Sequence, residues 1–286
     1  MRQKYLKYYQ RYRGLGALVF LGGALRADSR MARLSLMNRY RDYLRLAGRP
    51  DLLVLHREMN RRLLEAAKGW DSYDYGQGYF YQSCDLIGVS GLRDTRARLE
   101  AMGLRELLKH KTVLEIGCNS GFLALSVADV AKHVVGFDVN GHLIEVARLA
   151  AAALGTSNAE FLPCSFEDFA CRETFDAVLS FANHRTYDGN TRQPIGQYFR
   201  RCRELVKPGG LLLFESHPPA HEGQGLEGVC SIIEELFAVK ERRVLEYGTF
   251  LDRGRTYIVA RRPEVPAADP PTPGQAGGAA GPTSRL

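Results

Sequence analysis

From residue 111 onward, short apolar segments alternate with helical patterns, and this alternation constrains the fold more than any other feature of the sequence. Strands separated by helices form a mainly parallel sheet that is covered on both faces. Only a short turn around residues 248–254 joins the last two strands, so the final strand should run antiparallel. We therefore expect an α/β fold with a Rossmann-like, seven-stranded, doubly wound sheet whose last strand is reversed. The expected strands are 112–116, 133–138, 159–163, 175–180, 211–216, 238–246 and 255–260, and the expected helices of this region are 121–131, 142–154, 195–206 and 226–235.

The first strand leads into a Gly-rich loop within residues 113–121 (VLEIGCNSG). A dinucleotide site favours the spacing Gly-x-Gly-x-x-Gly, in which the second Gly lets a pyrophosphate approach the following helix. Here Asn119 stands where that Gly should be, and Glu115 at the strand end would repel a pyrophosphate. S-adenosylmethionine (SAM) instead presents an ammonium and a sulfonium group, so a carboxylate at this position favours SAM.

A second carboxylate, Asp138, closes the next strand and is followed by Val139. A carboxylate at this position can accept hydrogen bonds from both hydroxyls of a ribose. The alternative is that Asp138 only caps a helix or lies in an exposed turn. Two acidic side chains at adjacent strand ends fit a cationic nucleoside better than a diphosphate.

At this point the chain resembles the class I SAM-dependent methyltransferases over about residues 111–261. The resemblance implies a seven-stranded sheet with a reversed last strand. It also implies that Glu115 and Gly117 lie near the methionine end of SAM, and that Asp138 lies on the ribose. The loop residues Cys118, Asn119, Gly121 and Val139 complete this part of the expected cofactor site. The resemblance rests on four segments, 113–121 (VLEIGCNSG), 136–140 (GFDVN), 175–180 (FDAVLS) and 205–210 (LVKPGG).

The adenine end of the expected site departs from the family pattern. Members of the family commonly carry an acidic residue shortly before a Glu-Asp pair, where it reaches the adenine amino group. Ser165 occupies that position in residues 161–168 (FLPCSFED). We expect Ser165 to accept one hydrogen bond and the backbone of Phe166 to meet the adenine ring, with Glu167 alongside.

Upstream of the first strand, residues 81–95 (YQSCDLIGVSGLRDT) are similar to the segment through which substrate enters some methyltransferases. Arg93 is the candidate partner of the cofactor carboxylate, and Gln82 or a tyrosine is a candidate to close the pocket. The alternative is that Asp94 and Thr95 merely begin the following helix, which is expected from about 93 to 110.

Catalytic residues should follow the fourth and fifth strands, because ligands of such sheets bind beyond the carboxyl ends of the strands. His184 is the preferred general base, since neutral imidazole titrates near working pH. Asn183 is expected to orient the substrate or the methionine group, and His217 is a second candidate base or substrate ligand. His184 and His217 could instead be ordinary loop residues.

Histidines and carboxylates also raise the question of a divalent metal that polarises a hydroxyl group. Such residues scattered over two loops are more often unligated, so we expect no metal. The residues concerned are His184, Asp188, His217, His221 and Glu222.

The net charge of +7 arises in the first 70 residues, which carry 16 Lys and Arg against 5 Asp and Glu. This basic helical extension, residues 1–70, should contain two helices within 30–69, broken at residues 48–50. This positive charge can belong to a solvated helical face. The alternative is that the segment binds an anionic partner, namely a membrane surface, a phosphorylated substrate or RNA. Residues 1–27 imitate a signal peptide but have too short an apolar run to span a bilayer, so peripheral membrane contact through residues 1–30 stays an alternative.

The remaining segments complete the expected organisation. Residues 71–110 form an aromatic lid segment followed by a helix, and residues 111–262 form the SAM-binding domain. Residues 263–286 are rich in Pro, Ala and Gly and should be disordered. None of the six cysteines forms a Cys-x-x-Cys pair, which favours free thiols in the cytoplasm, with the inner membrane surface as a further location.

These patterns predict a methyltransferase that uses SAM to modify an oxygen or nitrogen atom of a small polar or glycan-type substrate. The alternative is an RNA-modifying enzyme, such as a tRNA methyl- or carboxymethyltransferase, whose basic N-terminal helices bind phosphates. A non-enzymatic adaptor is disfavoured because Glu115, Gly117, Gly121 and Asp138 are all in place. The sequence predicts no particular oligomeric state.

Overall fold

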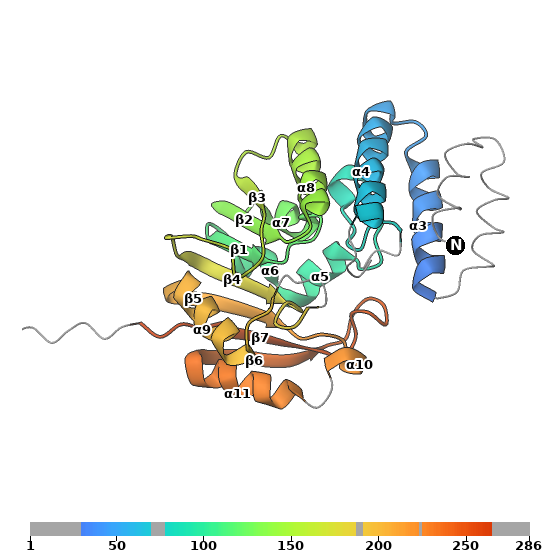
Figure 1. Ribbon diagram of the computed structural model, residues 1–286. Coiled ribbons are helices and arrows are strands. Elements are labelled where there is room, and N and C mark those ends of the chain that lie inside the picture. The colour runs from blue at the N-terminus through green and yellow to red at the C-terminus, as the bar shows by residue number, and fades with distance from the viewer. Residues whose placement is uncertain (1–29, 70–77, 187–190, 223–224, 265–286) are drawn as a thin grey trace, which may run out of the picture.

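The computed structural model describes residues 30–69, 78–186, 191–222 and 225–264 (Figure 1). A seven-stranded sheet of order β3-β2-β1-β4-β5-β7-β6 lies at its centre. Only β7 runs antiparallel to its neighbours, so the expected α/β sheet with a reversed last strand is confirmed. The strands are β1 (Thr112–Ile116), β2 (His133–Asp138), β3 (Ala159–Pro163), β4 (Phe175–Phe181), β5 (Val206–Glu215), β6 (Ala238–Leu245) and β7 (Arg255–Arg261).

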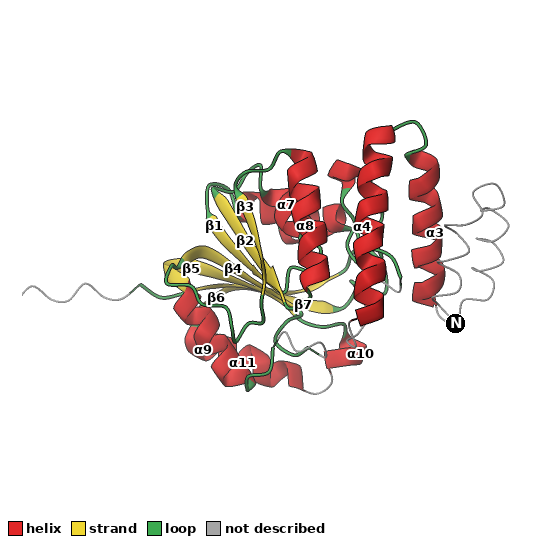
Figure 2. Cartoon of the chain, turned by 45° about the horizontal axis from the view of Figure 1, so that its top comes forward, coloured by secondary structure: helices red, strands yellow, loops and turns green. Residues whose placement is uncertain are grey.

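Helices cover both faces of this sheet, as Figure 2 shows. Their apolar residues join two separate clusters, one on each face of the sheet. The first face is covered by α4 (Pro50–Gly69), α5 (Thr95–Met102), α6 (Leu104–Leu107), α7 (Phe122–Val127) and α8 (Gly141–Leu154), and the second face by α9 (Ile195–Leu205) and α11 (Leu226–Leu236). Two short helices, η1 (Asp85–Ile87) and α10 (Pro219–Glu222), lie in connections, and α3 (Arg30–Arg45) lies beside α4.

The register of the parallel strands brings three acidic residues to one edge of the sheet. Glu115 of β1 pairs with Gly136 of β2, two residues before Asp138. In the same way Phe181, the last residue of β4, pairs with Glu215, the last residue of β5. The carboxyl ends of β1, β2, β4 and β5 therefore meet at this edge, where ligands of open α/β sheets bind.

Local sequence explains where the central helices begin and end. The side chain of Asn140 accepts a hydrogen bond from the backbone N–H of His142 at 3.1 Å and so caps α8, which ends at the left-handed Gly155. The helix expected over residues 93–110 is two helices, because Gly103 adopts a left-handed conformation that ends α5. The helix expected over 121–131 ends at Val127. The fifth strand begins at Val206, five residues before its predicted start at 211.

The N-terminal helices are joined to the sheet domain by polar contacts and by apolar packing. Met59 of α4 is fully buried in the cluster that includes α7 and α8, and Arg62 pairs with Glu145 of α8 at 2.8 Å. Asp42 of α3 is fully buried and accepts hydrogen bonds from the hydroxyl of Tyr79 at 2.7 Å and from the backbone N–H of Ser90 at 2.6 Å. One buried carboxylate thus holds α3 against the segment that precedes the sheet.

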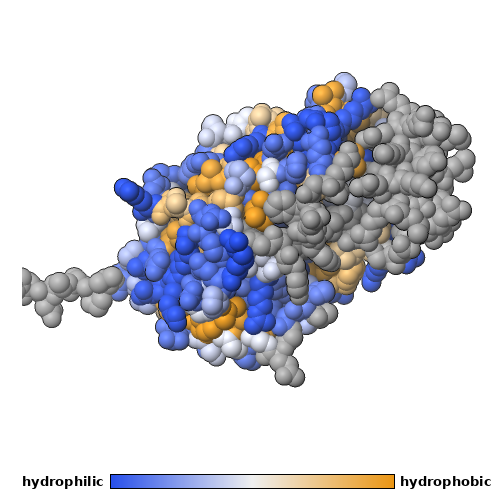
Figure 3. Space-filling model, viewed as in Figure 1, coloured by the Kyte–Doolittle hydropathy of each residue, from blue (hydrophilic) through white to orange (hydrophobic). Residues whose placement is uncertain are grey.

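Several expected features lie outside the described residues. They are the signal-like residues 1–27, the first part of the aromatic lid segment (70–77), Asp188, and residues 265–286 of the tail. The described surface that faces the viewer in Figure 3 is mostly hydrophilic, with small apolar patches between. Among the described helices, none has the length and apolar composition that a membrane crossing requires.

We predict that Asp42→Ala destabilises the protein by about 2 kcal/mol, because it leaves the buried N–H of Ser90 without a partner. The free energy of unfolding from urea denaturation measures this loss. Asp51→Ala, which removes an exposed acid of α4, is the matched control. Equal stability of the two variants would contradict an anchoring role for Asp42.

Candidate active site

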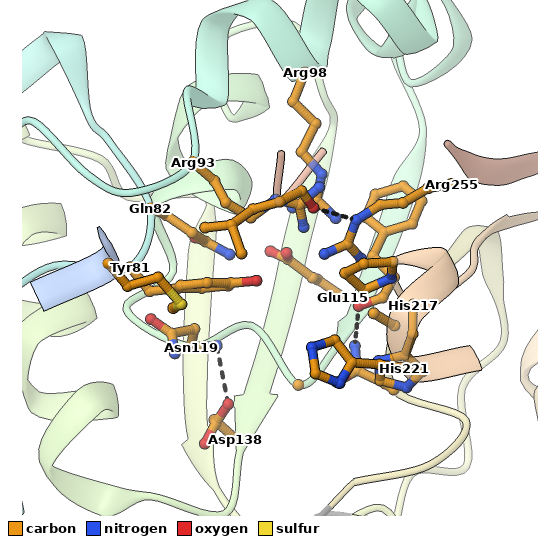
Figure 4. A pocket seen from close by; sticks show the side chains of 17 residues that line it. Tyr81, Gln82, Arg93, Arg98, Glu115, Asn119, Asp138, His217, His221 and Arg255 are labelled. Atoms are coloured by element: carbon orange, nitrogen blue, oxygen red, sulfur yellow. Dashed lines mark hydrogen bonds between the residues drawn. The ribbon is translucent and has the colours of Figure 1, made fainter. Parts of the chain in front are cut away.

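A cavity of about 370 Å³ opens at the carboxyl edge of the sheet (Figure 4). One part of its wall comes from the ends of β1, β2 and β4. The opposite part comes from the connection after β5 and from the start of β7, and α3 contributes Met31. The lining residues are Met31, Tyr81, Gln82, Arg93, Arg98, Glu115, Gly117, Asn119, Asp138, Phe181, Ala182, Asn183, His217, Pro218, His221, Leu251 and Arg255.

The loop between β1 and α7 needs unusual backbone conformations. Gly117, Asn119 and Gly121 all have positive φ. A Cβ atom on Gly121 would lie only 2.5 Å from the ring of Phe161, so no larger residue fits there. Asn119 is among the residues that tolerate the left-handed region. The loop therefore keeps its backbone close to the cavity without the second Gly of a dinucleotide site.

Asp138 is held rigidly at the end of β2. Its Oδ2 accepts a hydrogen bond from the backbone N–H of Asn119, and its Oδ1 accepts one from the N–H of Asn140, both at 2.9 Å. Each carboxylate oxygen can accept a second hydrogen bond, and Figure 4 shows the side chain at the cavity wall beside Asn119. This geometry suits two neighbouring hydroxyl groups.

Glu115 is a buried acid without a hydrogen-bond partner for its Oε2 among the described residues. Burial raises its pKa to about 8, although the nearby Arg98 acts in the opposite direction. A cationic ligand would stabilise the ionised form of such a buried carboxyl group, because the positive charge would compensate the hydration that burial removes.

A cluster of buried charges closes the opposite end of the cavity. Glu215 accepts two hydrogen bonds from the guanidinium of Arg93, at 2.6 and 3.3 Å, and another from Arg98. Asp252 accepts the Nε–H of Arg93 at 2.6 Å, and Arg255 lies 3.9 Å from Glu215. Burial alone would raise the pKa of Glu215, but the three arginines outweigh it and lower that pKa.

This cluster contains functional candidates that the sequence did not indicate. Arg98 and Arg255 both line the cavity. Arg98 lies inside a helix and Arg255 is the first residue of an apolar strand. A charged residue at either position is ordinarily expected to be exposed to solvent. The acidic Glu215 at the end of β5 was the available signal, since a buried strand that ends in an acid needs a cationic partner. Arg93 lines the cavity as expected, but Glu215 and Asp252 already engage most of its donors.

The structure separates the three expected catalytic residues. His217 and Asn183 line the cavity, and the side-chain N–H of Asn183 ties the end of β4 to the carbonyl of Ile116 in β1. His184 is not an exposed loop residue, because its ring is buried behind the wall and its Nε2 lies 2.8 Å from Glu222. Packing against Phe214 keeps that ring away from the cavity.

His217 stands between this buried pair and the cavity. Its ring lies 4.9 Å from that of His184, and its Nε2 has no hydrogen-bond partner among the described residues. Burial, reinforced by the neighbouring His184, lowers the pKa of His217 to about 4. The imidazole is therefore neutral at pH 7, and burial makes it a weaker base than a free histidine.

The residues expected around adenine do not line the cavity. Ser165 donates its hydroxyl to Asp168 at 2.6 Å, and the ring of Phe166 is buried against Phe137. Glu167 accepts the backbone N–H of Arg192 in the connection before α9. Val139 is half-buried outside the lining, and Cys118 is a core residue packed against β2.

Within the described part of the chain, no three His, Cys, Asp or Glu side chains come together in an arrangement that could hold a metal ion. His184, His217 and Glu222 are adjacent, but both carboxylate oxygens of Glu222 are already engaged, one by the ring of His184 and the other by the backbone N–H of His217.

Comparison with known proteins agrees with the geometry. The methyltransferase domain family matches residues 113–210, from β1 to the start of β5. The part of the chain that holds Glu115 and Asp138 is therefore similar to a methyltransferase domain. The fold is similar to that of the N-methyltransferase NodS from Bradyrhizobium japonicum, solved with S-adenosyl-L-homocysteine (SAH), which aligns with 73% of this chain and 99% of its own at a TM-score of 0.50 and 18% identity.

Curated relatives match the same domain. The ubiquinone biosynthesis O-methyltransferase of Cereibacter sphaeroides is 37% identical over 122 residues, which are 42% of this chain and 44% of the relative. The protein of the same name from Paraburkholderia xenovorans is 33% identical over 123 residues, 42% of this chain and 50% of the relative. The chain thus spans about half the length of the curated relatives it matches.

We predict that Glu115→Gln raises the melting temperature of the ligand-free protein at pH 8 by about 2 °C or more. The folded-state pKa of Glu115 lies above its unfolded value, so the wild type loses stability as pH rises from about 5 to 8, whereas glutamine does not ionise. Thermal scans at pH 5 and pH 8 should show that the melting temperature of Glu115→Gln exceeds that of the wild type by more at pH 8 than at pH 5. The exposed Glu160→Gln serves as control, and a pH-independent difference would argue against the raised pKa.

Proposed function

We propose that this protein is a methyltransferase that takes a methyl group from SAM and transfers it to a hydroxyl group of a small molecule. The single observation that carries the proposal is the buried carboxyl group of Glu115, whose Oε2 has no hydrogen-bond partner among the described residues and which lines a cavity together with the rigidly held Asp138. These two acids fit a ligand that combines a positive charge with a ribose. The methyltransferase domain of residues 113–210 supports the same reading.

The residues present fit SAM at each part of the cofactor that they would touch. Asp138 would accept hydrogen bonds from the ribose hydroxyls, and Glu115 would face the cationic methionine end. Arg98 suits the methionine carboxylate better than Arg93, because Arg98 donates to Glu215 alone and its Nε has no partner among the described residues, while Arg93 is bound to Glu215 and Asp252. When bound, SAM supplies a methyl group made electrophilic by its positively charged sulfur.

The protein's own part in the reaction is to align the acceptor, exclude water and receive a proton. His217 is the side chain best suited to the proton, since it is neutral at pH 7, lines the cavity and has an unpartnered Nε2. We propose that the role expected of His184 belongs to His217. Glu222, which binds His184 through one oxygen and the backbone N–H of His217 through the other, fixes the loop that carries His217.

The acceptor is proposed to be an oxygen atom, because the curated relatives that match the domain are named as O-methyltransferases. The apolar side chains of Met31, Phe181 and Leu251 give the cavity wall room for the carbon skeleton of a small molecule. The RNA alternative gains less support from the described helices. Several of their arginines are already in ion pairs, such as Arg61 with Glu58 and Glu65.

We predict that SAH binds with micromolar affinity in calorimetry and that Asp138→Ala weakens this binding by about 100-fold, because two hydrogen bonds to a charged group are lost. Glu160→Ala, which removes an exposed acid of β3, should bind SAH as the wild type does. Retained affinity in Asp138→Ala would overturn the ribose assignment, and a protein that binds NAD rather than SAH would overturn the proposed function.

We also predict that His217→Gln lowers turnover about 100-fold, the usual scale for losing a general base, without weakening SAH binding. Turnover is measured as label transfer from methyl-labelled SAM into an RNase-treated small-molecule extract, and the product mass should rise by one methyl group. His221→Gln, at another position of the cavity wall, is the control. Unchanged turnover in His217→Gln would exclude it as the base.

A further inference from the structure

The charges around the closed end of the cavity do not balance. Arg93, Arg98 and Arg255 are all buried there, and their ion pairs with described residues involve two carboxylates, those of Glu215 and Asp252. An unbalanced buried charge costs several kcal/mol unless a partner compensates it. One guanidinium of the three therefore lacks a carboxylate of its own.

The hydrogen bonds identify Arg255 as that residue. Arg93 is bound by both carboxylates, and Arg98 donates directly to Glu215. The Nε of Arg255 donates a hydrogen bond to the carbonyl of Leu251, and its Nη1 donates one to the carbonyl of Ser216. Its Nη2 donates to no described residue. Burial and the neighbouring Arg93 lower the pKa of Arg255 from its usual value, and Glu215, whose carboxylate lies 3.9 Å away, offsets this only in part.

The surplus persists when the proposed cofactor is counted. The carboxylate and the ammonium of its methionine part cancel, and its sulfonium is balanced by Glu115. Arg255 also lies at the end of the cavity away from Asp138, close to His217 (Figure 4). This is the part of the wall that follows β5, where an acceptor would meet the proton-accepting His217.

We propose that Arg255 binds an oxyanion, a carboxylate or a phosphate, that is carried by the methyl acceptor. The inference rests on the proposed function and adds the chemical class of the substrate. A guanidinium whose other donors are fixed to backbone carbonyls keeps its free Nη2 in one position, which suits recognition of a planar or tetrahedral oxyanion. An acidic group held there fixes the orientation of the acceptor relative to His217.

The test uses protein saturated with SAH, so that the cofactor half of the cavity is filled. Calorimetric titration with benzoate, phenyl phosphate and benzamide compares a carboxylate, a phosphate and an uncharged analogue of similar size. At least one of the two anions should bind about tenfold or more tightly than benzamide. The stronger of the two identifies which oxyanion the site prefers.

Variants connect this preference to Arg255. Arg255→Gln should abolish the preference for the anion while SAH affinity stays within about twofold of the wild type. Arg255→Lys keeps the charge, and it should retain part of the preference even if the glutamine variant fails to fold. Arg253→Gln removes an exposed arginine of the same turn and should change nothing.

The outcomes distinguish failure of the oxyanion site from failure of the proposed function. Equal binding of benzoate, phenyl phosphate and benzamide, no binding of either anion, or an unchanged anion preference in Arg255→Gln and Arg255→Lys would overturn the oxyanion site. Failure of the wild-type protein to bind SAH would instead overturn the proposed function.

Discussion

The ion cluster around Glu215 is the interaction on which the architecture of the site depends. It joins three parts of the chain, because Arg93 and Arg98 precede the sheet, Glu215 ends β5 and Arg255 begins β7. A carboxylate with no exposed surface tolerates burial only when its charge is compensated. The cluster therefore fixes the segment that closes the cavity against the edge of the sheet, and it gives that end of the cavity a positive character.

The opposite end of the cavity has the reverse character, and this division suits group transfer from a cationic cofactor. Asp138 gives the β1–β2 side a negative character, to which Glu115 adds when a bound cation favours its ionised form, while Arg255 lies on the side of β5 and β7. Two ligands with different charges can thus occupy the same cavity in a fixed order. His217 lies on the acceptor side of this division, where a proton would have to be removed.

Much of the fold and the cofactor side could be predicted from sequence, because they depend on local patterns. Apolar periodicity located the strands, and the loop with Glu115 and Gly117 ends where a strand meets a helix. The residues expected around adenine do not line the cavity, because tertiary packing engages them elsewhere. Ser165 forms a hydrogen bond to Asp168, and Phe166 fills a core between strand and helix, which no local motif reveals.

The sequence by itself determined the sheet, its reversed last strand and the acids at the ends of β1 and β2, since each follows from residues adjacent in the chain. Only the tertiary structure showed that His184 is buried while His217 lines the cavity, because the packing around each ring depends on segments distant in sequence. It alone also placed Arg255 in the wall of the cavity. The balance of buried charges depends on side chains that are brought together from segments distant in sequence.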